Sequence, residues 1–126
     1  MDSVDFDALE AQARAKMAPA SFAFGAAGAD DEISATENIT AWRDLRLRPR
    51  VLNDVATIDT RVTLLGSAVA SPILVAPTGR HKLFHVEGER ATARGASAAG
   101  AAYVMASNAN VTVEVVAAER RGAPQW

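Results

Sequence analysis

The hydrophobic pattern centres on a short run of consecutive apolar residues, Ile73–Ala76, that ends in the turn Pro77–Gly79. Consecutive rather than alternate apolar positions are typical of a strand covered on both faces, as in parallel sheets. A second apolar run, Ala102–Ala106, follows an Ala-rich segment, Glu87–Ala99, which Gly100 should end. The order strand, helix, strand predicts one right-handed βαβ unit with parallel strands, and therefore an α/β fold.

Weaker patterns flank this unit. The residues from Ile58 to Val69 indicate a small hairpin with Gly66 at or near its turn. After the second strand, Thr112 should cap a third helix that runs through Glu119. A third strand is predicted to begin at Ala123–Trp126.

The first part of the chain has helical spacing. Ser3 is a suitable N-cap for a first helix that Pro19 should close, and the segment Ser21–Ala29 is rich in small residues. The acidic triplet of residues 30–32 places negative charge where a second helix should start and continue towards Leu45. Adjacent side chains point in different directions, so the triplet favours helix capping over metal binding.

Four arginines crowd the stretch after this second helix, namely Arg43, Arg46, Arg48 and Arg50. A nucleic-acid contact is one interpretation. The other is a solvated loop in which the guanidinium groups pair with Asp44 and Asp54, and the charge balance favours it. With 13 basic and 15 acidic residues, a net charge of −2 and a pI near 5.6, the chain has no electrostatic footprint for nucleic acid or an anionic membrane.

Composition limits the number of domains and the kinds of site and location that the chain allows. A chain of 126 residues that is 49% hydrophobic suits one domain or part of one. The absence of cysteine excludes disulfides, cysteine-based zinc sites and a cysteine nucleophile. The first residues are acidic and no apolar run approaches the roughly 18 residues of a membrane span, so we expect neither a signal peptide nor a membrane segment, and a cytoplasmic location.

The ends of the two predicted strands carry the candidate chemistry. Pro77 has no N–H for a neighbouring strand, and Gly79 lets a flat ligand approach the backbone. The polar run Ser107–Asn110 follows the second strand and should lie on the same rim. Because ligands bind at the carboxyl ends of parallel strands, the turn suits a planar, phosphate-bearing ligand. The alternative is a plain transition from strand to loop.

A second candidate site comes from the spacing of His81, His85 and Glu89, which suggests metal ligands on a helical face. Gly79 and Gly88 bracket this segment and argue against one continuous helix. Polar loop residues, with Glu87 and Glu89 capping the following helix, are the favoured interpretation.

Several motifs together resemble one family, the FMN-dependent α-hydroxy-acid oxidases and dehydrogenases of the glycolate and lactate oxidase type. The matching residues are Ala29, Glu32 and Asn38, Arg48-Pro49-Arg50-Val51-Leu52, Ala76-Pro77-Thr78-Gly79, His85 with Glu87-Gly88-Glu89, Ala91 with Ala93-Arg94, and Glu114. The resemblance implies the first third of a (β/α)8 TIM barrel of about 250 residues. Residues 1–57 would form an N-terminal helical segment with an Arg-rich loop, and residues 58–126 the hairpin and first β/α units.

The resemblance also implies a function: FMN-dependent oxidation of a small 2-hydroxy acid to a 2-oxo acid, in a parent protein that is a homo-oligomer. It places two groups of residues at the site, cofactor-binding Pro77, Thr78, Gly79, Ala106 and Ser107, and substrate-binding Phe24 and Asn108. Three of these depart from the family pattern, because Phe24 replaces a tyrosine, Asn108 a tryptophan and Ala106 a serine. These departures leave the substrate open.

The family's catalytic histidine, substrate-binding arginine, flavin-contacting lysine and phosphate site all lie beyond the point that Trp126 reaches. No catalytic residue is therefore assigned within this chain. Neither His81 nor His85 is expected to be the catalytic base, because the resemblance places them in the loop and helix start after the first strand. The alternative to an enzyme is a non-catalytic truncated or split fragment that acts only as an association partner. Another phosphate-binding barrel enzyme is a third class that composition alone does not exclude.

Overall fold

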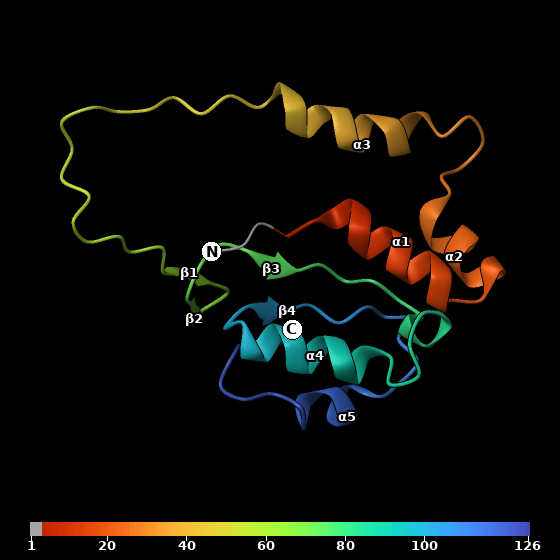
Figure 1. The fold of residues 1–126 in the computed structure, drawn as a ribbon. Helices are drawn as coiled ribbons and strands as arrows, with labels where there is room; N and C mark the ends of the chain where they lie inside the picture. Colours follow the sequence, from red (N-terminus) through yellow and green to blue (C-terminus); the bar gives the residue numbers. More distant parts are fainter. Residues whose placement is uncertain (1–3) are drawn as a thin grey trace. The chain divides into compact units, whose positions relative to one another are not determined.

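A computed structural model describes residues 4–126 and divides the chain into two compact units, Met1–Asp54 and Val55–Trp126 (Figure 1). The first unit holds three helices, and the second holds two short sheets with the remaining helices. Among the described residues, no helix combines the length and apolar character that crossing a bilayer requires.

The first helix, α1, spans Phe6–Lys16. Asp5 is its N-cap, and the Asp5 carboxylate accepts a hydrogen bond from the Ala8 N–H at 2.9 Å. Ser3, predicted as the N-cap, lies outside the described residues. Arg14 stacks over the ring of Phe22 at 4.5 Å from its centroid, a cation–π contact that joins α1 to the next helix.

Two sequence predictions for the first unit are wrong in detail. Pro19 does not simply close α1, because it opens a second helix, α2 (Pro19–Ala26), where its missing N–H removes no helical bond. The acidic triplet does precede a helix, α3 (Ile33–Asp44). However, the Glu32 carboxylate does not cap α3, since it accepts a hydrogen bond from the Gly28 N–H at 2.9 Å.

The second unit opens with the predicted hairpin. Strand β1 (Val62–Leu64) pairs antiparallel with β2 (Ser67–Val69). The two residues between them, Leu65 at φ 47° and Gly66 at φ 77°, are both left-handed. Two left-handed residues make a two-residue turn whose twist matches that of the strands, so the hairpin and the role of Gly66 are confirmed.

A parallel βαβ unit follows. Strand β3 (Leu74–Val75) pairs in parallel with β4 (Ala102–Tyr103), with Leu74 opposite Ala102 and Val75 opposite Tyr103. Helix α4 (Glu89–Ala98) connects them, and Gly100 at φ 67° follows its end. The predicted parallel arrangement is therefore confirmed, although both strands are shorter than the apolar runs.

Two further helical elements flank α4 and β4. The 3-10 helix η1 (His81–Leu83), which the sequence does not predict, precedes α4. Helix α5 (Val113–Ala117) follows β4 with Thr112 in the N-cap position, as predicted, but it ends before the predicted Glu119. Gln125 then bridges to Tyr103 in parallel, and the Trp126 N–H donates to the Tyr103 carbonyl at 3.0 Å. A third parallel strand thus begins where the sequence places it.

The core of this unit lies between the β3–β4 sheet and helices α4 and α5, and its buried members are Ala93, Ala96, Tyr103 and Val116. Val75 packs against this cluster, whereas Ile73 is 73% exposed. The predicted cover on both faces of the first strand is therefore wrong for the described residues, because side chains from α4 and α5 pack on Tyr103 and Val75 and none shields Ile73.

One buried group of this core makes a testable prediction. The Tyr103 side chain is 2% exposed, and its hydroxyl has no hydrogen-bond partner among residues 4–126. Tyr103→Phe removes an unpartnered polar atom and keeps the ring, so we expect the free energy of unfolding to stay equal or to rise by up to about 1 kcal/mol. Urea denaturation checks this, with Tyr103→Ala as the control that should lose about 3 kcal/mol or more. A clear loss of stability in Tyr103→Phe would contradict it.

Candidate functional site

The carboxyl ends of β3 and β4 bring two loops together at one rim. Pro77 and Thr78 are exposed, and Gly79 is half-buried. A Cβ atom placed on Gly79 would lie only 1.8 Å from Asn108 Oδ1, so the Asn108 side chain rests directly against the Gly79 backbone. The prediction that both strand ends share a rim is confirmed for this pair of residues, and any Cβ at position 79 would force the Asn108 side chain to move.

A buried carboxylate joins the same two loops beneath this contact. Glu89, the first residue of α4, is 0% exposed. Its Oε1 accepts hydrogen bonds from the His81 N–H at 3.2 Å and from the Asn110 N–H at 2.9 Å. We call Glu89 together with these two N–H groups the rim clamp. The Lys82 N–H adds a further link by donating to Asn110 Oδ1 at 2.9 Å.

The electrostatics of the rim clamp favour the charged form of Glu89. Burial alone would raise the pKa of this carboxyl group, but hydrogen bonds from the N–H groups of Asn110, of Glu89 itself and of His81, together with the charge of His81, outweigh burial and lower the pKa. In turn, burial and the negative charge of Glu89 raise the pKa of Tyr103. The clamp thus works as an ionised acceptor at neutral pH.

The two histidines have other partners within this segment. His81 Nδ1 forms a hydrogen bond with Thr92 Oγ1 at 2.9 Å, and His85 Nδ1 accepts one from the Glu87 N–H at 3.3 Å. Within the part of the chain that the structure describes, no group of three histidine or acidic residues is suited to hold a metal ion. The segment therefore behaves as a hydrogen-bonded loop.

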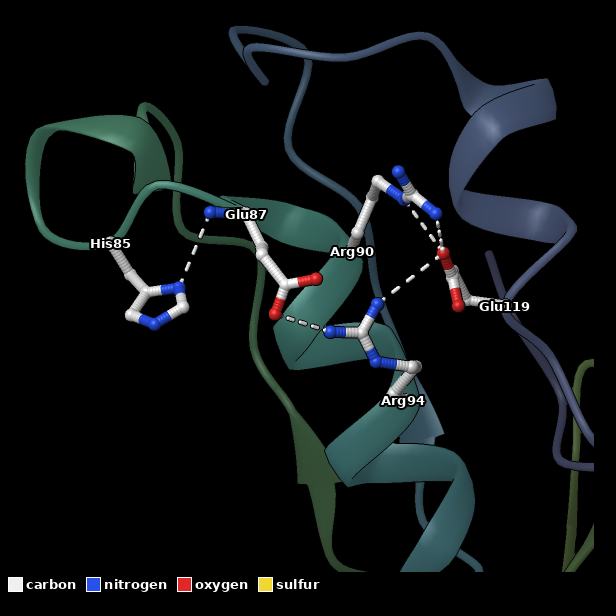
Figure 2. A network of polar contacts seen from close by, with 5 residues as sticks. All are labelled: His85, Glu87, Arg90, Arg94 and Glu119. Carbon is white, nitrogen blue, oxygen red and sulfur yellow. Dashed lines mark hydrogen bonds and ion pairs between the residues drawn. The ribbon is translucent and has the colours of Figure 1, made fainter.

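A more exposed polar network fastens α4 to the turn after α5 (Figure 2). Arg94 contacts Glu87 at 2.5 Å and Glu119 at 3.4 Å, while Arg90 contacts Glu119 at 2.6 Å. The hydrogen bond from Arg90 lowers the pKa of Glu119. Of the two glutamates predicted to cap the helix, Glu87 instead pairs with Arg94, whereas Glu89 occupies the first turn.

The remaining predicted site residues take no part in this network. Ala106 and Ser107 follow β4 and help to line an open pocket of about 420 Å³ that also includes Met105 and Trp126. Phe24 lies on α2 in the other compact unit and is 63% exposed. The structure thus brings Gly79 and Asn108 into contact and places Ala106 and Ser107 along the same strand end.

Sequence reasoning missed the rim clamp. It treated Glu89 as a helix-capping or metal-binding residue and gave Asn110 no role beyond a polar strand end. The only signal was the position of Glu89, directly after Gly88 at the start of an Ala-rich helix. Its partners lie 8 and 21 residues away, and such distant pairing leaves no mark in local periodicity.

Comparison with known proteins decides the family. A family model described as FMN-dependent dehydrogenase matches residues 13–126. The chain belongs to this family. It is 40% identical over 118 residues to 2-hydroxyacid oxidase 2 of Mus musculus, covering 94% of this chain and 33% of the relative. It is also 40% identical over 122 residues to glycolate oxidase of Spinacia oleracea, covering 97% and 33%.

Solved structures agree with this assignment. A crystal structure of mandelate oxidase with a difluorinated hydroxy acid matches with a TM-score of 0.89 and 35% identity, covering 98% of this chain and 37% of that chain. The family named from the sequence motifs is therefore confirmed, and with it the dependence of the family on FMN. The chain spans about a third of the length of the curated relatives it matches.

The rim clamp predicts a loss of stability in acid. Because the folded-state pKa of Glu89 is lowered, its carboxylate stabilises the fold at neutral pH, and this contribution is lost as the pH falls through the ordinary glutamate pKa and then through the lowered one. We expect Glu89→Gln to be less stable than the unmodified chain at pH 7 and to lose less stability on acidification. Denaturant titrations across this pH range measure both, and equal acid losses in the two proteins would show that other carboxylates are responsible.

The contact between Gly79 and Asn108 makes a second prediction. In Gly79→Ala the new Cβ displaces the Asn108 side chain, and because that side chain can swing away, we expect a cost of about 1 kcal/mol. The double variant Gly79→Ala with Asn108→Ala removes the clash, so the cost of the glycine change should vanish. A double-mutant cycle of unfolding free energies measures this coupling, and additive effects would refute the contact.

Proposed function

We propose that this chain forms the flavin-ring side of an enzyme that oxidises a 2-hydroxy acid to a 2-oxo acid with FMN. Membership of the FMN-dependent dehydrogenase family supports the cofactor. The names of the relatives, 2-hydroxyacid oxidase 2, glycolate oxidase and mandelate oxidase, support the substrate class. The observation that carries the proposal is the exposed turn Pro77–Gly79 at the carboxyl end of a parallel strand.

The donor set of this turn fits the edge of a flavin ring. The N–H groups of Thr78 and Gly79 take part in no hydrogen bond among the described residues, so two adjacent backbone donors are open to a ligand. Pro77 offers no N–H and keeps a further strand from pairing there. Ala106 and Ser107, along the neighbouring strand end, would complete the contact with the ring.

In this proposal each part of the chain has a limited task. When bound, FMN accepts the two electrons that leave the substrate. The N–H groups of Thr78 and Gly79 would orient the ring and would favour negative charge at its edge. The rim clamp holds the turn in place, and Asn108 borders the turn from the second loop. No residue of this chain is assigned as the base that takes the substrate proton.

The fold that goes with this function is a (β/α)8 barrel. We infer that β3, α4, β4, α5 and the strand beginning at Ala123 are its first units, since the strands are parallel, sequential and connected by helices. The carboxyl ends of such strands carry the active site in barrels of this kind. The rim that bears Pro77–Gly79 and Asn108 would then face the substrate.

The finer substrate assignment rests on two residues. Phe24 lacks the hydroxyl, and Asn108 the indole, that the resemblance associates with glycolate oxidases, so we propose a preference that differs from theirs. A hydroxyl hydrogen bond to a charged group is worth about 1.5–3 kcal/mol. A homo-oligomeric parent and a cytoplasmic location also stay predictions.

Binding of FMN tests the proposal directly. We expect the purified chain to retain FMN on a size filter and to perturb its visible absorbance. Thr78→Pro removes one backbone donor and should weaken binding roughly tenfold, which corresponds to about 1.4 kcal/mol. Thr78→Ala keeps that N–H and should bind within about twofold of the unmodified chain.

The outcomes separate the two functional classes. Retained flavin with the expected order of variants supports a ring-binding rim and makes it worth measuring catalysis after complementation with the part of a relative that this chain does not cover. If FMN washes through while circular dichroism shows a folded chain, the non-catalytic fragment becomes the better description of this molecule. Equal binding by Thr78→Pro and Thr78→Ala would show that the Thr78 N–H takes no part in FMN binding.

A further inference from the structure

Glu89 is hydrogen-bonded to matching positions of the two loops at the rim. His81, one of its donors, comes two residues after Gly79, and Asn110, the other, comes two residues after Asn108. Gly79 and Asn108 are the pair in contact at the rim. One carboxylate oxygen therefore holds each loop two residues after the residue at which the loops touch.

The two oxygens of the Glu89 carboxylate differ in their hydrogen bonds. Glu89 Oε2 is buried and has no hydrogen-bond partner among residues 4–126. Burying a charge is costly unless the protein supplies hydrogen bonds to it, and both loops supply them to the same oxygen, Oε1. A charged acceptor does give stronger and shorter hydrogen bonds to N–H groups than a neutral one, which suits the holding of two loops in fixed positions.

We propose that Glu89 is the positioning residue of the rim, which sets the Pro77–Gly79 turn against the loop that carries Asn108. The identity of the ligand that benefits, the flavin ring, rests on the proposed function above. Glu89 touches no ligand in this scheme, since its side chain is wholly buried and acts through the N–H groups of His81 and Asn110. The competing explanation is a general stabilisation of α4 by negative charge at its first turn.

Amide hydrogen exchange of the whole chain separates these explanations. In Glu89→Ala we expect the His81 and Asn110 amides to exchange at least about tenfold faster, while amides further along α4, such as that of Ala96, stay within about twofold. Glu89→Gln keeps an acceptor oxygen and should restore most of the protection. The matched control is Glu87→Ala, which removes an exposed glutamate two residues earlier that pairs with Arg94 and should leave both rim amides unchanged.

Faster exchange spread evenly through α4 and the core would overturn the proposal, because Glu89 would then stabilise the unit as a whole. Unchanged exchange at His81 and Asn110 would overturn it as well. The same variants titrated with FMN test the link to the flavin: weaker retention by Glu89→Ala, rescued by Glu89→Gln, supports positioning for the ring. Failure of the unmodified chain to retain FMN counts against the proposed function alone, since hydrogen exchange still decides the role of Glu89.

Discussion

The arrangement of the rim depends on one buried charge. A carboxylate removed from water must have its hydrogen bonds supplied by the protein, and Glu89 obtains them from backbone N–H groups of two different loops. Because those donors belong to the main chain, the constraint acts on loop conformation and not on the side chains the loops carry. The residues that border a ligand can therefore vary while the backbone beneath them keeps its shape.

The sheet places a second constraint on the unit. Parallel strands are normally covered on both faces, yet the described residues supply helices α4 and α5 to the Tyr103 side of the pair and leave Ile73 exposed. The relatives that the chain matches are about three times as long. The consecutive apolar positions at Ile73–Ala76 therefore do not correspond to a strand covered on both faces within the described residues.

Local chemistry accounts for what could be predicted from the sequence. Gly66 identified the hairpin because a two-residue turn needs left-handed backbone, and the two apolar runs around an Ala-rich helix identified the parallel unit. Pro19 was misjudged because proline suits a helix start as well as a stop. Glu32 was misjudged because a nearby N–H, that of Gly28, competed for its carboxylate. Glu89 needed partners 8 and 21 residues away, which only the folded chain reveals.

Recognition through backbone donors separates two kinds of sequence change in such a site. In the proposed site, Thr78 and Gly79 offer N–H groups to the ligand, so a substitution matters there only if it alters the conformation or, as at Gly79, fills the space that Asn108 occupies. At Asn108 the side chain itself borders the rim, so a substitution changes the shape that a substrate would meet. In the proposed site, cofactor binding can then persist while the shape beside the substrate changes.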